Sequence, residues 1–284
     1  MAVLPAQTFL FADLAGFTAL TEAHGDEAAV EMCRRLTSTV SNLAEGREAD
    51  LVKTIGDAVM IRTPDPVIAI ELGLGVVGRL SHHGSPPVRV GIHSGPAIGE
   101  DGDWFGATVN LASRVSNAAH PGEVLLTEAT RQALPAQSGL QLKPRGLRNF
   151  KHIPDRVPVY AAIGSGPVGE ELEIDPVCRM AVDPELAAAV HRRHGVTRYF
   201  CSAACAEAYA AEPRRYLVRT VRARAARAAF RTHLRVFLIA QFVFFVAWGI
   251  GSLLEGPQSP WFLLLLVGWG IPLALHHRAV RPVL

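Results

Sequence analysis

The chain has 284 residues, a formal net charge of +2 and 49% hydrophobic residues. This length allows one sizeable domain with smaller modules, and the near-neutral charge argues against nucleic-acid binding through bulk electrostatics. Four cysteines occur, three of them within residues 178–205, a pattern that favours a metal or redox site over a disulfide framework. The N-terminus lacks a basic segment followed by an apolar core and a cleavage site, so no signal peptide is expected.

Residues 1–163 predict an α+β domain with helices on one face of a mixed sheet. Apolar runs bounded by turn residues predict strands at residues 8–12, 51–55, 58–61, 88–93, 124–126, 140–142 and 157–161. Apolar side chains at helical spacing predict helices at residues 26–45, 66–80 and 108–117. Gly56 and Asp57 are expected to form a hairpin turn between two of the strands.

Two aspartates are notable because each lies beside a turn glycine at the end of an apolar, strand-like run. Asp13 follows the first expected strand, and Asp57 lies in the hairpin turn. Magnesium takes one or two carboxylate ligands from a protein and the rest from phosphate and water. Two such ions can stabilise the attacking and leaving oxygens of a phosphoryl displacement. The pair therefore predicts a phosphoryl-transfer site.

A family resemblance rests on three segments, FADLAGFT at 11–18, KTIGD at 53–57 and DWFGATVNLASR at 103–114. Together they resemble the catalytic domain of the class III nucleotidyl cyclases, which implies a ferredoxin-like α+β fold. The resemblance implies that Asp13 and Asp57 hold two Mg²⁺ or Mn²⁺ ions, with the Leu14 carbonyl assisting.

The third segment supplies two further residues. Asn110 and Arg114 are four positions apart, so they share one face of a helix. The resemblance implies that Asn110 orients the ribose, and that Arg114 stabilises charge on the pentavalent phosphorus. It also implies a homodimer, because in that family the metal aspartates come from one domain and the Asn and Arg from another. His93 and His120 are expected to be structural.

Base choice also has candidates. Lysine donates and an ionised aspartate accepts, which suits the N1 acceptor and the N6 donor of adenine. Lys53 and Asp103 fall where adenylyl cyclases carry these two types, so the resemblance implies ATP as substrate. Lys151 resembles the family lysine that contacts the terminal phosphates, although His152 stands where the family often has glycine.

Residues 164–173 are expected to be a flexible linker, followed by a small module at 174–217. The module resembles the YHS family, which is linked to heavy-metal binding. Soft thiolates suit Zn²⁺ or similar metals, and Cys178, Cys201 and Cys205 are the candidate ligands. His191 and His194 are candidates for a fourth ligand, and Arg179 replaces the usual family glycine. The alternative is that the three cysteines pack as small apolar groups.

Residues 218–284 predict a basic helix and two membrane spans, at about 236–254 and 261–275. Eight arginines lie between Arg214 and Arg235, and the region resembles bacterial two-transmembrane hairpin domains. Basic flanks on both sides place both ends in the cytoplasm, which implies the cell inner membrane, contact with lipid and a cytoplasmic catalytic domain. The alternative is a buried helical hairpin of a soluble protein.

The combined prediction is a membrane-anchored adenylate cyclase that forms cyclic AMP from ATP, with a metal-binding module between catalysis and membrane. It binds no nucleic acid. Two alternatives remain at this point. One is a metal-sensing membrane protein whose cyclase-like domain mainly binds nucleotide, and the other is a membrane scaffold that has lost activity.

Overall fold

The computed structural model describes residues 6–164, 172–193, 196–256, 259–260, 263 and 268–269. Most of the expected linker, the candidate ligand His194 and most of the second expected span lie outside these residues. The chain divides into two units, Met1–Ala211 and Glu212–Leu284.

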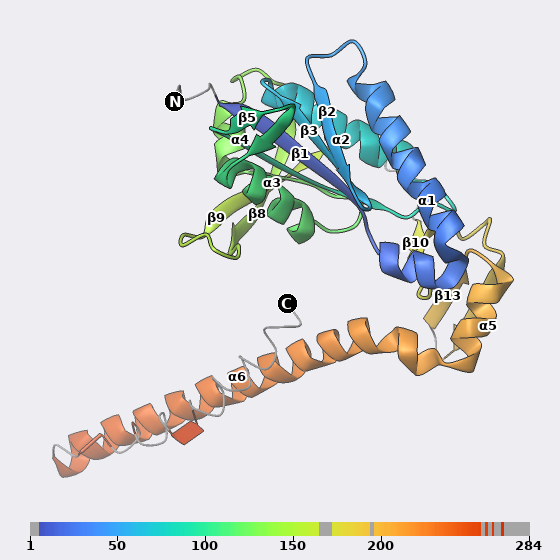
Figure 1. Ribbon diagram of the computed structural model, residues 1–284. Helices are drawn as coiled ribbons and strands as arrows, with labels where there is room; N and C mark the ends of the chain where they lie inside the picture. Colours follow the sequence, from blue (N-terminus) through green and yellow to red (C-terminus); the bar gives the residue numbers. More distant parts are fainter. Residues whose placement is uncertain are drawn as a thin grey trace. The chain divides into compact units, whose positions relative to one another are not determined.

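The first unit is built on a seven-stranded sheet, flanked by helices (Figure 1). The strands in sheet order are β2 (Asp50–Ile55), β3 (Ala58–Thr63), β1 (Gln7–Leu14), β4 (Val88–Gly95), β7 (Val124–Thr127), β9 (Val157–Ile163) and β8 (Gln141–Arg148). The helices are α1 (Phe17–Ala44), α2 (Pro66–Leu80), α3 (Ala107–Ala118) and α4 (Glu128–Ala133), and a separate hairpin pairs β5 (Ile98–Glu100) with β6 (Asp103–Phe105).

The first six elements run β1-α1-β2-β3-α2-β4, and their strands lie in the order β2-β3-β1-β4. This is the ferredoxin-like arrangement, so the predicted α+β fold is confirmed. The β1 strand pairs antiparallel with both β3 and β4, while β4 pairs parallel with β7. The end of β1 is therefore held between two neighbours, which positions Asp13.

Helices cover both faces of the sheet rather than the single face expected. Successive strand residues point to opposite faces. Val90 of β4 faces Gly73 of α2, whereas the next residue, Gly91, faces the backbone of α3 at Ser116. The α3 face also carries a buried apolar cluster around Phe9, Phe11, Met60, Val109 and Ala112. The sheet is consequently buried on both sides around β1 and β4.

Close packing at Gly91 gives a stability prediction. A β-carbon built there would lie 1.9 Å from the backbone nitrogen of Ser116, so Gly91→Ala must separate β4 from α3. Overpacking of this kind costs about 2–3 kcal/mol or more, and we expect a melting temperature lower by about 5–10 °C. Gly78→Ala, at a helical position with open space around it, is the matched control and should be neutral or slightly stabilising. Equal melting temperatures for the two variants would contradict this packing.

Three parts of this domain were not predicted from the sequence. The α1 helix begins at Phe17 rather than at residue 26, and it contains a break at Gly25 with φ 82° and ψ 171°. Glycine adopts such a conformation without a β-carbon clash. The break interrupts the apolar period, which is why the segment 17–24 was missed. The short α4 and the β5–β6 hairpin were missed because neither is long enough to show a period.

The cysteine module consists of two small hairpins and a helix. It comprises β10 (Glu173–Ile174) with β11 (Ala181–Val182), β12 (Ala189–Arg193) with β13 (Val196–Phe200), and α5 (Ala203–Ala211). The buried Phe200 and Tyr209 rings pack together, with centroids 5.3 Å apart. His191 packs edge-on against the same Tyr209 ring at 5.6 Å.

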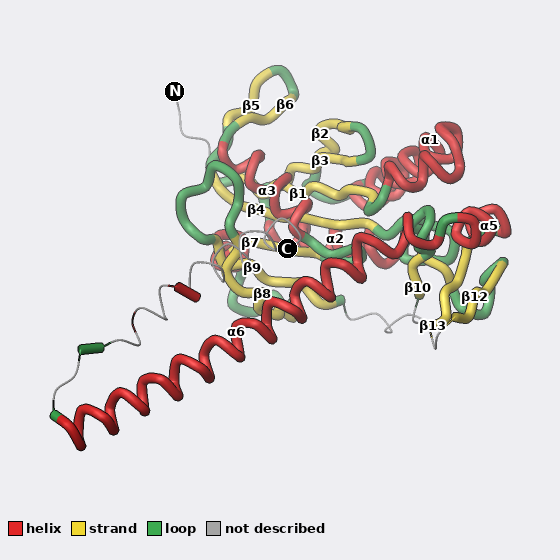
Figure 2. Tube along the Cα trace, turned by 90° about the horizontal axis from the view of Figure 1, so that it is seen from below, coloured by secondary structure: helices red, strands yellow, loops and turns green. Residues whose placement is uncertain are grey.

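The second unit contains α6 (Pro213–Glu255), a helix of 43 residues that Figure 2 shows as continuous. Its part Thr232–Leu254 is long and apolar enough to cross a membrane, with a mean hydropathy of 2.1. Trp269 donates to His233 Nε2 at 2.8 Å and packs edge-on against Phe237. Trp269 therefore lies beside α6 at His233 and Phe237, and a second span over 261–275 stays a prediction.

Candidate functional site

The structure brings Asp13 and Asp57 together. Asp13 lies near the end of β1, where its register partner on β3 is Ala58, the residue after Asp57. The Leu14 N–H donates to the Asp57 carbonyl at 3.3 Å, and Gly56 takes φ 61° in the turn. The antiparallel pairing of β1 with β3 thus brings together two residues that are 44 positions apart in sequence. The two carboxylates face each other.

Electrostatics at this pair fit a cation site. Burial raises the pKa of Asp13 to about 6, opposed by the charge of Arg89 and assisted by the charge of Asp57. Two carboxylates this close resist simultaneous ionisation unless a cation neutralises them. The donor set is hard oxygen, which Mg²⁺ and Mn²⁺ prefer. The residues present therefore fit the divalent cations that the cyclase fold implies.

Arg89 is a residue of this site that sequence reasoning missed. It is the β4 register partner of Asp13, and its guanidinium forms an ion pair with the Asp13 carboxylate. The Asp13 side chain is 13% exposed and that of Arg89 is 25% exposed. Arg89 Nε is buried without a hydrogen-bond partner in the described part of the protein. Only the pairing of β1 with β4 could have revealed this residue.

Lys53 and Asp103, the expected base-reading residues, lie in contact. Lys53 Nζ is 2.5 Å from Asp103 Oδ2, and the Trp104 N–H donates to Asp103 Oδ1 at 2.7 Å. The hydrogen bond from Lys53 is the main cause that lowers the pKa of Asp103. The pair joins β2 to the β5–β6 hairpin and remains partly exposed, so both side chains are accessible to a ligand.

Asn110 and Arg114 lie on α3, which packs against the sheet through Val109, Leu111, Ala112 and Val115. Asn110 is exposed and Arg114 is half-buried. Among the described residues, no side-chain hydrogen bond or ion pair joins either of them to Asp13 or Asp57. Within one chain, the carboxylates and the Asn110–Arg114 pair are therefore not joined by direct polar contacts among the described residues.

Lys151 is exposed in the turn before β9, and no hydrogen bond or ion pair joins it to the other described site residues. The following residue, His152, adopts φ 60°. This left-handed conformation favours glycine, which gives a physical reason for the glycine that the resembled family often has there.

His93 is hydrogen-bonded inside the domain, as its expected structural role requires. Its Nδ1 lies 2.7 Å from Thr127 Oγ1, and burial lowers its pKa to about 4. The backbone N–H of His120 donates to Glu123 Oε2 at 2.8 Å in the turn before β7.

His93 gives a pH prediction. Because its folded pKa lies below the unfolded value of 6.5, protonation favours unfolding, and stability is lost as pH falls from 6.5 to 4. The loss is up to about 3 kcal/mol. Other groups also titrate here, since the raised pKa of Asp13 acts in the opposite direction. The measurement is therefore the difference in unfolding free energy between wild type and His93→Gln, which should narrow as pH falls. A difference independent of pH would contradict the buried neutral histidine.

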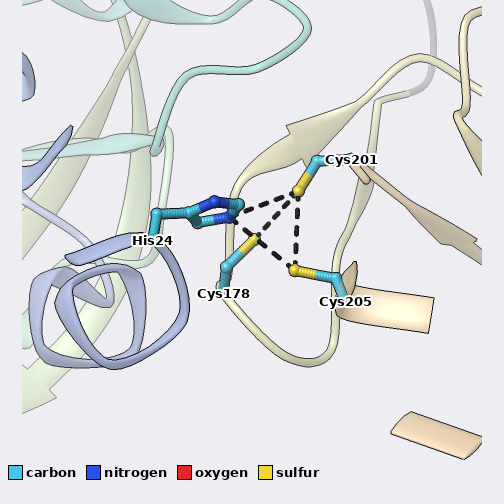
Figure 3. A group of neighbouring side chains, drawn as sticks. All are labelled: His24, Cys178, Cys201 and Cys205. Atoms are coloured by element: carbon cyan, nitrogen blue, oxygen red, sulfur yellow. Dashed lines mark hydrogen bonds between the residues drawn. The ribbon is translucent and has the colours of Figure 1, made fainter. Parts of the chain in front are cut away.

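The three predicted cysteines meet a fourth side chain, His24 of α1 (Figure 3). The ligand atoms of all four residues lie within 4.8 Å of one another. Cys201 Sγ is 3.4 Å from Cys178 Sγ and 3.7 Å from Cys205 Sγ. His24 Nε2 lies 3.5 Å from Cys201 Sγ and 3.7 Å from Cys205 Sγ.

The residue that lies beside the three cysteines, His24, is not among the fourth ligands expected from the sequence. His191 is engaged with Tyr209 rather than with the cysteines, and His194 lies outside the described residues. Both histidines are near the cysteines in sequence. His24 is far from them in sequence, so its role depends on tertiary structure alone.

Three families of known proteins match successive parts of this chain. Residues 4–161 match the family described as the adenylate and guanylate cyclase catalytic domain. Residues 174–220 match the YHS domain, and residues 219–280 match the 2TM domain. The three-part order predicted from the sequence is confirmed. The 2TM match and the apolar helix Thr232–Leu254 indicate a membrane protein.

Two curated relatives resemble the N-terminal part. The pH-sensitive adenylate cyclase MT1302 of Mycobacterium tuberculosis is 39% identical over 150 residues, which cover 51% of this chain and 38% of that protein. An adenylate cyclase of Streptomyces coelicolor is 39% identical over 125 residues, covering 44% of this chain and 33% of that protein. The matching part thus spans less than two fifths of either relative.

Solved structures support the fold. Adenylate cyclases of Trypanosoma brucei in their monomeric state align with a TM-score of 0.52 at 22% identity, covering 56% of this chain and 89% of theirs. The guanylate cyclase domain of RhGC from Catenaria anguillulae, in complex with GTP, aligns with a TM-score of 0.51 at 21% identity, covering 58% and 99%. These likenesses establish the class III cyclase fold.

Proposed function

Because this chain belongs to the family of adenylate and guanylate cyclase catalytic domains, we propose that it is an adenylate cyclase. It converts ATP to 3′,5′-cyclic AMP and pyrophosphate. The observation that carries the proposal is the meeting of Asp13 and Asp57 at the ends of adjacent strands. The relatives named adenylate cyclase support the same activity.

In the proposed reaction the 3′-oxygen of ATP forms a bond to its own α-phosphorus, and the bond from that phosphorus to the bridging oxygen breaks. Pyrophosphate leaves with the bonding electron pair, and the hydroxyl proton passes to solvent. Because the nucleophile belongs to the substrate, no serine or cysteine nucleophile is required.

Asp13, Asp57 and the Leu14 carbonyl are the proposed ligands of two Mg²⁺ or Mn²⁺ ions. When bound, these ions neutralise phosphate charge and lower the pKa of the 3′-hydroxyl. Arg89 already lies against Asp13 and is proposed to bind phosphate oxygens, since its fork of donors matches them. Lys151 is proposed to contact the terminal phosphates.

Asn110 and Arg114 are proposed to act on ATP held by the carboxylates of a second copy. Both carry donors that are not engaged elsewhere in the described chain, and Arg114 is charged at every working pH. Arg114 stabilises charge on the α-phosphoryl group, and Asn110 orients the ribose. A two-fold homodimer creates two equivalent sites of this kind.

Lys53 and Asp103 are proposed to select adenine. Lys53 has three donors, so it can bond Asp103 and donate to adenine N1 together. Asp103 keeps free lone pairs for the N6 amino group. Guanine presents a donor at N1 and an acceptor at C6, so binding it would cover Lys53 and Asp103 without satisfying their hydrogen bonds, which is the physical basis of rejection.

Exchange of this pair gives a specificity prediction. Lys53→Glu with Asp103→Ser replaces the donor with an acceptor and removes the acceptor's charge. We expect the ratio of kcat/KM for ATP over GTP to fall by about a hundredfold or more. Lys143→Gln, at an exposed lysine on β8, lowers the net charge by the same single unit and controls for the change in charge. An unchanged ratio would show that Lys53 and Asp103 do not read the base.

The remaining parts of the chain are proposed to anchor and regulate the enzyme. The apolar helix Thr232–Leu254 follows seven arginines between Arg214 and Arg231, which favours a cytoplasmic position for the preceding segment. We place the chain in the cell inner membrane with its catalytic domain in the cytoplasm. Cys178, Cys201 and Cys205 are proposed to bind a soft metal.

The test is an assay of purified full chain with ATP or GTP, in Mg²⁺ or Mn²⁺, with detection of cyclic nucleotides. Cyclic AMP formation with a clear preference for ATP is expected. Nucleotide binding without any cyclic product would instead favour the second candidate, a metal-sensing membrane protein whose cyclase-like domain mainly binds nucleotide. The observation that supports this second candidate is the cluster of His24 with three cysteines.

A further inference from the structure

The separations between ligand atoms in the four-residue cluster are close to those around a single tetrahedral ion. Zinc–sulfur bonds of about 2.3 Å and zinc–nitrogen bonds of about 2.0–2.1 Å separate tetrahedral ligand atoms by roughly 3.5–3.8 Å. Cys201 Sγ lies 3.4 Å from Cys178 Sγ, 3.5 Å from His24 Nε2 and 3.7 Å from Cys205 Sγ. Cys178 and Cys205 are buried, so the centre is shielded from water. Three thiolates and one imidazole form a ligand set typical of structural zinc.

Asp175 organises the module's side of this cluster. Its carboxylate is fully buried and accepts from the backbone N–H groups of Val177 at 2.8 Å and Cys201 at 2.9 Å. It thereby ties the loop carrying Cys178 to the loop carrying Cys201. Outer groups that orient ligands in this way are a regular feature of metal sites.

The fourth ligand comes from the catalytic domain. His24 is the last residue before the break of α1 at Gly25, and Figure 3 shows its ring pointing toward the three sulfurs. The break lets the segment Phe17–His24 take a direction different from that of the rest of the helix. This segment starts four residues after Asp13, so its position bears on the carboxylate site.

Two more contacts connect the module to the same site. Gly16 lies so close to Arg179 that a β-carbon on Gly16 would be 2.6 Å from Arg179 Cβ. Arg179 itself adopts φ 69°, the conformation for which the resembled family has glycine. Ala181 exchanges backbone hydrogen bonds of 2.9 Å with Gly84 and Ser85, in the loop that leads into β4 and Arg89.

These contacts meet at the catalytic pair. The Ala15 N–H donates to the Pro87 carbonyl at 2.8 Å, which joins the segment after Asp13 to the loop before Arg89. The module therefore touches both segments that carry the Asp13–Arg89 ion pair. Anything that orders the module would also fix these two segments.

We propose that His24, Cys178, Cys201 and Cys205 bind one Zn²⁺ ion between the catalytic domain and the YHS module, and that the ion sets the position of the segment after Asp13. The free energy of zinc binding then stabilises the ordered arrangement of both the catalytic domain and the YHS module. The regulatory half of this inference rests on the proposed cyclase activity, whereas the zinc site does not. The result is an enzyme whose activity depends on zinc at a second site.

The test uses the full chain, depleted of metal and titrated with buffered Zn²⁺, in wild type, His24→Ala, His24→Cys and His191→Ala. We expect one zinc per chain in wild type. His24→Ala should lower zinc affinity by at least about tenfold, while His24→Cys retains a four-ligand set and tight binding. His191→Ala, which removes the ligand candidate near the cysteines in sequence, should bind as wild type does.

Two readouts are independent of turnover. The visible absorption of Co²⁺ at the site reports tetrahedral thiolate ligation, and amide hydrogen exchange of residues 17–24 reports the connection to α1. Zinc should slow that exchange in wild type and in His24→Cys but not in His24→Ala. Equal zinc affinity in His24→Ala and wild type would overturn the proposal. So would a wild-type amide exchange rate in residues 17–24 that is the same with and without zinc.

Activity is then measured separately. Cyclic AMP formation by wild type should rise about fivefold or more with zinc, whereas His24→Ala should not respond. A chain that binds zinc through His24 but never forms cyclic AMP would refute the proposed function and leave the zinc site established. An active chain without zinc binding would refute the zinc site alone.

Discussion

Asp57→Ala is expected to reduce cyclic AMP formation by on the order of a thousandfold. The carboxylate is one of two that hold the divalent ions, and losing several kcal/mol of charge stabilisation at tenfold per 1.36 kcal/mol gives this size. The fold should survive, because Asp57 lies in a turn and its removal relieves repulsion on Asp13. Measurement of kcat with saturating Mn²⁺ and of the melting temperature checks both statements.

Asp50→Ala is the matched control for this variant. Asp50 lies on the same hairpin, 68% exposed, and forms an ion pair with Arg62. Such exposed pairs contribute little to stability, so turnover should stay close to wild type. If folded Asp57→Ala turned over ATP as fast as wild type, the assignment of Asp57 as a ligand of the divalent ions would be contradicted.

Mixing two inactive variants is expected to restore activity. In a mixed dimer of Asp13→Ala and Arg114→Ala, one site contains both lesions and the other contains none. Random exchange of subunits with two-fold symmetry makes half of the dimers mixed, so about a quarter of wild-type activity should return. The physical reason is that Asp13 and Arg114 of one chain act on different substrate molecules.

The control for this experiment is a mixture of Asp13→Ala with Asp57→Ala. Both lesions lie in the carboxylate pair, so no site in the mixed dimer has both aspartates, and activity should not return. Mixed dimers are demonstrated by differently tagged chains. Their presence without recovered activity in the Asp13→Ala and Arg114→Ala mixture would contradict a site shared between subunits.

The catalytic fold was predictable because its signals are local. The strand ending at Asp13, the turn containing Asp57 and the helix from residue 66 to 80 each show a period or a turn residue within a short window. The roles of the individual site residues remain predictions. The expectation that two chains contribute to one site likewise stays a prediction.

Arg89 and His24 were not predicted because their partners are distant in sequence. Arg89 meets Asp13 only through the register of β1 with β4. His24 meets the cysteines only because α1 breaks at Gly25 and the module packs nearby. The sequence predicted His191 as a candidate ligand instead. His191 is close to the cysteines along the chain, but its ring packs on Tyr209. Glycine at position 25 was the available signal, since it interrupts a helical period.

The most direct test of the central claim is product analysis of ATP turnover by the purified full chain. Cyclic AMP and pyrophosphate are quantified together, in wild type and in Asp57→Ala. The proposed reaction predicts that both products appear in equal amounts with wild type and that both are lost in the variant. Formation of ADP and phosphate instead, or equal formation of cyclic AMP by the two proteins, would contradict it.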